Sequence, residues 1–212
     1  MIPLLSVCLH WVRKAPFAVD PRKICSTSGF FAAPCSKPRA IEGEAKVVRL
    51  PEQDPTTIQE YLNWMNTGEV DLMHPEALIR GKKPAFAGCN NRFALHFLAD
   101  YLHDVEFANR IMDLLVQLCA ESWPATRAQS IPSKQLDQTY AFTVADSPLR
   151  KLVLDCMLRV TCGASLAGSM HDLPRDCIYE LAGLAIKTAQ EGGWMNDFVG
   201  MEEKYQEPED AT

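Results

Sequence analysis

The group of side chains that most resembles a chemical site is His96, Asp100 and His103. Their spacing of i, i+4 and i+7 places them on one face of a helix. Two imidazoles and one carboxylate are ligands that zinc accepts. The apolar stripe of the same segment, which includes Leu98 and Tyr101, lies on the opposite face. We therefore expect the three polar side chains to face solvent and to bind no metal.

The best candidate for a nucleophile is Cys25, which follows the basic pair Arg22-Lys23. Nearby cations lower a thiol pKa, and a cysteine nucleophile also needs a positioned base. A packed thiol beside Ile24 is the interpretation that the sequence favours. The chain has no Gly-x-Ser-x-Gly, no phosphate-binding glycine loop and no His-Glu-x-x-His motif. We expect no enzyme, no catalytic residue and no cofactor, and a cysteine- or metal-dependent enzyme stays as the alternative.

Composition limits the partners and the compartment. The chain has 212 residues, with 21 basic and 27 acidic side chains and a net charge of −6, which argues against binding to a nucleic-acid backbone. No stretch reaches the ~20 apolar residues that span a membrane. Eight cysteines contain no Cys-x-x-Cys pair, and several fall at apolar helical positions. We expect reduced thiols and an intracellular protein, cytoplasmic or nuclear or both.

The elements that must position these residues change character near residue 54. Alternating apolar residues predict short strands at 5–12, 17–19 and 46–50. Pro21 can open a helix between the last two. Asp54 and Pro55 then form a cap and first position, and Gly68 ends the helix that they begin.

Strong helical periodicity fills the rest of the chain. Helices are predicted at 92–103 and 106–119, a linker at 121–132, and further helices at 148–160 and 174–189. Ser147 and Pro148 provide the start of the third of these helices. Residues 200–212 are acidic and poor in apolar side chains, so a disordered tail is expected.

Several phrases of the sequence, taken together, resemble the BTB/POZ family, in the form found in short fungal BTB-domain proteins. They are FAVDPRKICSTSGFF at 17–31, VVRLPEQDP at 47–55, YLNWMNTGEV at 61–70, LADYL at 98–102 and SPLRKL at 147–152. The chain departs from the family pattern at several positions. Asp20-Pro21 stands where His-Lys is usual, Lys23 where an apolar residue is usual and Asn66 where a tyrosine is usual, and residues 11–15 replace a glycine-rich hairpin turn.

The resemblance implies an α/β (α+β) fold in which helices flank a small sheet, followed by an all-helical extension. It places the BTB-like domain at 5–120, the linker at 121–132 and the extension at 133–195. We expect the extension to pack on the BTB-like part, because its apolar stripes need a partner.

The resemblance also implies a non-catalytic protein-interaction module, a scaffold or adaptor, with cullin ubiquitin-ligase adaptor as the alternative within that class. Expected partners are other proteins, a cullin or a second copy of the chain among them, and neither nucleic acid nor membrane. A monomer or weak dimer is expected because of Lys23. The candidate interaction surface consists of Leu5, Val7, Leu9, Lys23, Phe30 and Phe31.

Overall fold

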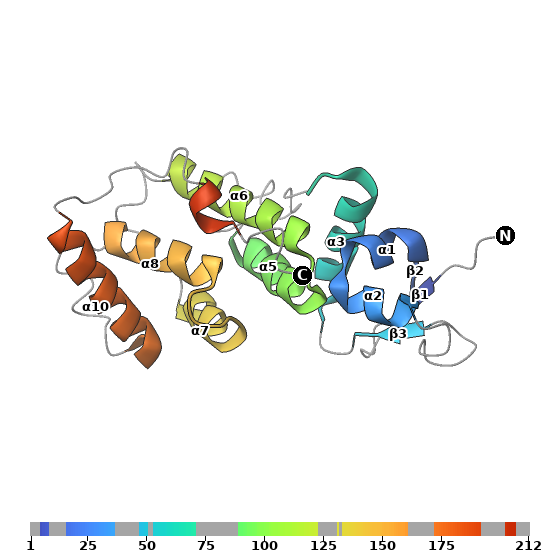
Figure 1. Cartoon of the computed structure of the whole chain (residues 1–212), viewed down its shortest axis with the longest axis horizontal. Helices are drawn as coiled ribbons and strands as arrows, with labels where there is room; N and C mark the ends of the chain where they lie inside the picture. Colours follow the sequence, from blue (N-terminus) through green and yellow to red (C-terminus); the bar gives the residue numbers. More distant parts are fainter. Residues whose placement is uncertain are drawn as a thin grey trace, which may run out of the picture. The chain divides into compact units, whose positions relative to one another are not determined.

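The structure of the chain is a computed structural model (Figure 1). The structure describes residues 5–8, 16–36, 47–50, 53–70, 89–122, 131, 133–160, 172–191 and 202–206. These residues divide between two compact units. The first unit lies within Met1–Pro75 and Ala94–Ala108, and the second lies within Glu76–Phe93 and Asn109–Glu207.

Helices dominate the described part of the chain, so the prediction of an α/β class is wrong. The structure has eight α-helices there, whereas its strands are three or four residues long. A chain with this balance is mainly helical, because so few extended residues cannot provide a sheet that the helices would cover as a layer. The alternation that predicted strands was real but too short to set the class.

The extended segments of the first unit are β1 (Leu5–Cys8), β2 (Pro16–Val19) and β3 (Val47–Arg49). β1 pairs with β2 in antiparallel fashion, Leu5 opposite Val19, and with β3 in parallel, giving the order β2-β1-β3. Of these strand residues, Val19 is buried.

The first and third helices of the first unit begin where the sequence predicts, whereas the second was not predicted as a separate helix. Helix α1 (Pro21–Thr27) starts with a proline, and the Asp20 carboxylate accepts the Arg22 amide. Helix α2 (Gly29–Ser36) follows directly, and α3 (Pro55–Thr67) is capped by Asp54 and ended by the left-handed Gly68 at φ 74°. A side-chain cap of this type contributes about 1 kcal/mol.

Helices α5 (Cys89–Leu102) and α6 (Val105–Ser122) agree with the two strongly periodic segments. The first unit contains most of α5 and the start of α6. Its core gathers apolar side chains from both of these segments and from α1 to α3, namely Ile24, Phe31, Leu50, Ile58, Tyr61, Leu62, Trp64, Leu95, Leu98, Ala99, Leu102, Phe107 and Ala108.

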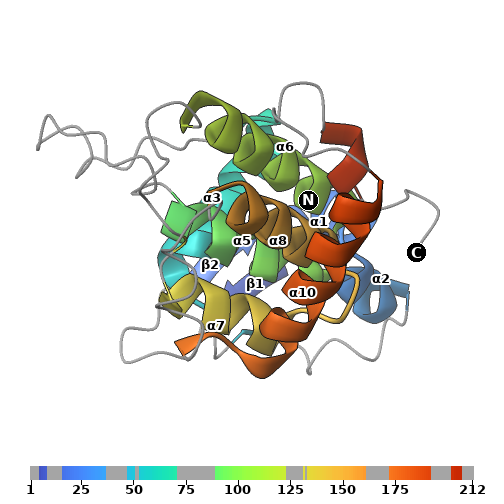
Figure 2. The same cartoon turned by 90° about the vertical axis from the view of Figure 1, so that its left-hand side faces the viewer.

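The second unit contains α7 (Ser133–Phe142), α8 (Pro148–Val160) and α10 (Arg175–Gln190), together with the rest of α6. Helix α8 packs against both α7 and α10, and Figure 2 shows the three side by side. Helix α7 carries only a narrow buried face, which includes Leu136 and Thr139, so the apolar periodicity does not reveal it.

One buried side chain holds these three helices together. Arg150 of α8 is 7% exposed and donates to the backbone carbonyls of Tyr140 and Thr143 near the end of α7. It also donates to the Thr143 hydroxyl and, at 3.2 Å, to the Glu180 carboxylate of α10. The Tyr140 hydroxyl donates to the other Glu180 oxygen at 2.8 Å. The last carbonyls of α7, which have no partner within their own helix, are thus satisfied from a neighbouring helix.

Residues 202–206 correct the expectation of a disordered tail over 200–212. They include a short 3-10 helix, η3 (Glu202–Tyr205), in which Tyr205 is fully buried. Lys204 and Tyr205 both donate to the Asp155 carboxylate on α8, and Gln206 donates to Asp113 on α6 at 3.1 Å. This segment therefore bridges α6 and α8 within the second unit.

Candidate interaction surface

Two helix corners meet in the first unit and form the frame of the candidate site. One corner joins α1 to α2 at Ser28-Gly29, and the other joins α5 to α6 at His103-Asp104. The buried Ser28 hydroxyl donates to the Leu102 carbonyl at 2.6 Å, and the Gly29 amide donates to the His103 carbonyl at 3.2 Å. The first corner thus satisfies backbone carbonyls at the end of α5.

The close approach of these corners depends on glycine. A Cβ added at Gly29 would lie 3.2 Å from the Cβ of His103, which is tighter than ordinary packing. On the other side, His103 adopts a left-handed φ of 51°, which ends α5 and turns the chain into α6. Histidine has a modest energetic penalty in the left-handed conformation. The fold tolerates this penalty at His103 because the His103 carbonyl accepts a hydrogen bond.

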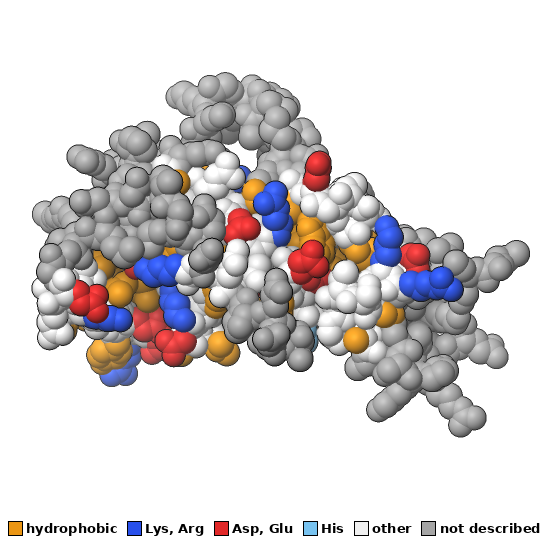
Figure 3. All heavy atoms as spheres, turned by 45° about the horizontal axis from the view of Figure 1, so that its top comes forward, with side chains coloured by type: hydrophobic (Ala, Val, Ile, Leu, Met, Phe, Trp, Pro, Cys, Tyr) orange, Lys and Arg blue, Asp and Glu red, His pale blue; other side chains and the backbone are white. Residues whose placement is uncertain are grey.

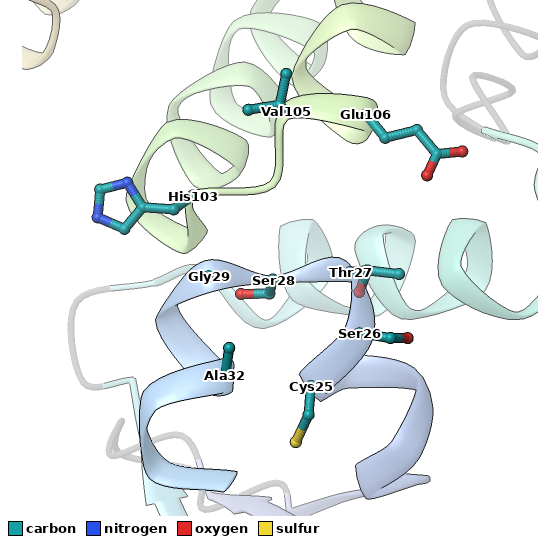
Figure 4. Close-up of a pocket in the computed structure, with 9 residues that line it drawn as sticks. All are labelled: Cys25, Ser26, Thr27, Ser28, Gly29, Ala32, His103, Val105 and Glu106. Carbon is teal, nitrogen blue, oxygen red and sulfur yellow. The ribbon is translucent and has the colours of Figure 1, made fainter. Parts of the chain in front are cut away.

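A groove of about 390 Å³ lies between the two corners (Figure 4). It is lined by Cys25, Ser26, Thr27, Ser28, Gly29, Ala32, His103, Val105 and Glu106. The α1–α2 side offers small side chains and hydroxyl groups, whereas His103 and Glu106 lie at opposite ends of the α5–α6 side (Figure 4). The groove therefore offers hydrogen-bonding groups along its length and ionisable groups at its ends.

Beside the groove, Asp104 connects the corner to the core. Its carboxylate accepts the Phe107 amide at 3.0 Å and so caps α6, and it also accepts the Tyr61 hydroxyl at 2.9 Å. Burial raises the pKa of Asp104, and burial also raises the pKa of Tyr61. The Tyr61 ring packs against Phe107 and Trp64, with the Trp64 and Phe107 ring centroids 4.6 Å apart. The corner is therefore positioned by a buried aromatic cluster.

An aromatic pair extends the surface next to the groove residues. Phe30, which follows Gly29, is half-buried, and its ring lies 5.3 Å from that of Tyr101 on α5. Tyr101 is 43% exposed. An exposed tyrosine supported by a second ring presents a rigid apolar surface with a polar tip.

The residues predicted to form the interaction surface differ in how exposed they are in the structure. Phe31 is buried at 1% exposure, so its assignment to an interaction surface is wrong. Phe30 is half-buried and Lys23 is exposed. The side chains of Leu5 and Val7, and the whole of Leu9, lie outside the described residues. Phe30 follows the groove residue Gly29 in sequence and packs on Tyr101, but it is not among the residues that line the groove.

Lys23 and Asn66, two of the positions that depart from the family phrases, lie next to each other. The Lys23 ammonium of α1 donates to the Asn66 side-chain oxygen of α3 at 3.4 Å, and both residues are exposed. The Asn66 amide nitrogen donates to the Leu62 carbonyl of its own helix at 2.9 Å. At this edge of α1 and α3 the surface is therefore polar.

The expectation that His96, Asp100 and His103 all face solvent is wrong for His96. The His96 ring is fully buried, whereas Asp100 is half-buried and His103 is exposed. The Nδ1 atom of His96 lies 3.5 Å from an Asp100 oxygen, and neither ring nitrogen has a hydrogen-bond partner. Among the residues described, no three histidine, cysteine or acidic side chains come together as a metal site.

The cysteines do not share one state, contrary to the expectation of reduced thiols throughout. Cys25 takes part in a disulfide bond, whereas Cys119, Cys156 and Cys177 are buried thiols. Cys25 also points away from His103 in the groove (Figure 4). The thiolate and base that a cysteine nucleophile needs are therefore not assembled here.

Charges of both signs are interspersed on the face drawn in Figure 3, with no continuous basic surface among its described side chains. In the part of the chain that the structure describes, no helix has the length and hydropathy needed to cross a bilayer.

The sequence did not identify Gly29, Tyr101 and Glu106 as surface residues, or the buried Ser28 as part of the groove lining. The pattern Ser-Gly between two short helical segments was a usable signal of a corner, since both residues are common in turns. Tyr101 was assigned to an apolar stripe, and its periodicity alone could not show that it lies at the stripe's exposed edge.

In comparisons with known proteins, no protein-family model and no curated protein matches the chain.

Proposed function

We propose that the chain is a non-catalytic protein-interaction module of the BTB type, acting as a scaffold or adaptor. The observation that supports this most directly is the groove between the two helix corners, with Phe30 and Tyr101 beside it. Its walls offer hydroxyl groups and backbone rather than a nucleophile with a base.

The chemistry of this surface suits a polypeptide partner. Tyrosine is enriched among residues that contribute most to protein–protein binding, because its ring gives a large contact area and its hydroxyl a hydrogen bond. The hydroxyls of Ser26 and Thr27 line the groove and donate to the Lys23 carbonyl of their own helix, so their oxygens can still accept a hydrogen bond from a partner's backbone amide. Glu106 favours a basic side chain at its end of the groove. The resemblance to BTB proteins, which includes phrases at 17–31 and 98–102 that contain several of these residues, points to the same class of function.

The matched tyrosines of the two units provide the test. Tyr101 is 43% exposed in the first unit, and Tyr179 is 63% exposed on α10 in the second. Affinity purification with quantitative mass spectrometry should recover specific proteins with the native chain and with Tyr179→Ser. With Tyr101→Ser, the recovered amount of these proteins should fall at least tenfold. Equal recovery with all three proteins contradicts the proposal that this surface binds partners.

A cullin adaptor is the narrower alternative, and it follows from the family resemblance. Titration of the chain with a purified cullin N-terminal region should then show saturable binding. Binding that is insensitive to Tyr101→Ser would place the cullin elsewhere on the chain. If the cullin does not bind, the cullin-adaptor function is excluded and the scaffold function remains the proposal.

A cysteine- or metal-dependent enzyme is the rival from another class. A thiol-reactivity profile and metal analysis of the purified protein separate it from an interaction module. A hyper-reactive Cys25, or stoichiometric zinc, would favour the enzyme.

A further inference from the structure

Two buried thiols on different helices face each other in the second unit. The Sγ atoms of Cys119 on α6 and Cys156 on α8 lie 3.3 Å apart. Their residues are 8% and 5% exposed. We propose that this pair is a redox-sensitive modification site, which closes to a disulfide when a hydroperoxide reaches it.

The geometry requires only a small movement. A disulfide holds its sulfurs about 2.0 Å apart, and the two thiols already touch at 3.3 Å. Rotation of the two side chains can close most of this gap, since each sulfur lies at the end of a single rotatable bond.

The two helices are also kept in register next to the thiols. Asp155, the neighbour of Cys156 in α8, accepts hydrogen bonds from Lys204 and Tyr205. The next residue, Gln206, donates to Asp113 on α6. Residues 204–206 therefore contact both α6 and α8, the helices that carry the two cysteines. While this segment stays bound to both helices, the two thiols stay next to each other.

The reaction balances with a hydroperoxide as the oxidant. The Cys119 sulfur, as thiolate, attacks one peroxide oxygen, the O–O bond breaks, and the leaving oxygen takes a proton to become water or an alcohol. The Cys156 sulfur then attacks the resulting sulfenic sulfur, the S–O bond breaks, and a water leaves. Two thiols lose two electrons in total, and the peroxide gains them. We assign the first step to Cys119 because it is the more exposed of the pair.

Cys177 is the matched control within the same unit. It is buried on α10, and its sulfur contacts the thioether sulfur of Met157 at 3.8 Å. Burial raises the pKa of the Cys177 thiol, which lowers its reactivity. Peroxide should therefore leave Cys177 as a thiol under conditions that link the other two.

The test uses the full chain exposed to hydrogen peroxide, followed by alkylation, trypsin digestion and mass spectrometry. Each cysteine of the pair falls alone in its tryptic peptide, Ile111–Arg127 and Leu152–Arg159. We expect these peptides to be linked in most molecules, two hydrogen masses below their sum, and separated again by a thiol reductant. The midpoint of thermal unfolding should rise by several degrees on oxidation, because the link closes the chain between the two cysteines.

The variants decide the outcome. Cys177→Ser should form the linked pair as the native chain does. Cys156→Ser should form none, should leave a sulfenic acid on Cys119, and should show no rise in unfolding temperature. Cys156→Val, an apolar replacement, repeats that test if the serine variant is poorly folded. The proposal is overturned if both thiols stay open to alkylation after unfolding of the treated protein, or if either links to another cysteine instead.

Discussion

At the scale of single residues, His96 shows how burial can override a polar pattern. Its ring is fully buried on α5, and both nitrogens are without hydrogen-bond partners. A buried polar group without a partner costs about 1–3 kcal/mol, whereas an apolar side chain of similar size avoids that cost.

We therefore predict that His96→Leu raises the free energy of unfolding by about 1 kcal/mol. Urea denaturation followed by circular dichroism measures it, with Asp100→Ala as the control for lost contact between the two side chains. A loss of more than about 2 kcal/mol would mean that the ring makes an interaction that leucine cannot replace.

Asp104 gives a prediction for pH. Burial raises its pKa in the folded state above the value of about 3.9 in an unfolded chain. The folded protein thus binds more protons than the unfolded chain between those two pKa values, and stability falls as pH rises through that window. Compared with Asp104→Asn, the native protein should gain stability as pH falls from neutral toward 4. If the unfolding temperatures of the two proteins depend on pH in the same way, Asp104 does not contribute to the pH dependence of stability.

At the scale of elements, Arg150 acts on the end of a neighbouring helix. Its guanidinium reaches two carbonyls near the end of α7 and the Glu180 carboxylate of α10 at once. Lysine has one ammonium on a flexible stem and cannot make this planar set of contacts.

We predict that Arg150→Lys lowers the free energy of unfolding by about 2 kcal/mol. Amide hydrogen exchange should increase most over 139–143, because those backbone groups lose the side chain that orders them. Arg175→Lys is the matched control, since Arg175 is exposed and donates only to the nearby Tyr179 hydroxyl in the described structure. If amide exchange over 139–143 is the same in both variants, Arg150 does not order the end of α7.

Local signals were sufficient to predict several helix ends and not the surroundings of the helices. Asp54, Gly68 and Pro148 mark boundaries that the structure confirms, because capping and chain reversal depend on neighbouring residues only. The burial of His96 and the Arg150 contacts depend on residues far along the chain. Helix α5 is buried over much of its circumference, so one stripe could not identify its solvent face.

At the scale of the whole molecule, the helical extension is needed for the apolar side chains of α6. Ile111, Leu115 and Cys119 are buried there, in the unit that continues through α8 and α10. We predict that a fragment ending at Ala120 aggregates, because these side chains lose their neighbours. A soluble 1–120 fragment that melts cooperatively would contradict this.

Oligomeric state is a second property of the whole chain. Lys23 is exposed, with its ammonium bonded to Asn66. A BTB-type dimer that covered this edge would have to bury the charge or rearrange it, at a cost of several kcal/mol when unpaired. We expect light scattering at micromolar concentration to find a monomer or weak dimer. A stable dimer that is unaffected by Lys23→Glu would show that the interface lies elsewhere.

The first unit is discontinuous in sequence, and this has a consequence for its biosynthesis. Its core needs Leu98, Leu102 and Phe107, which follow a segment that belongs to the other unit. A ribosome delivers the chain from its N-terminus at about 5–20 residues per second, so α1 to α3 emerge before the side chains that cover them. Until residue 108 has left the exit tunnel, Tyr61 and Trp64 lack their partner Phe107. The incompletely folded nascent chain is therefore accessible to chaperones and proteases for longer than the nascent chain of a contiguous unit of the same size.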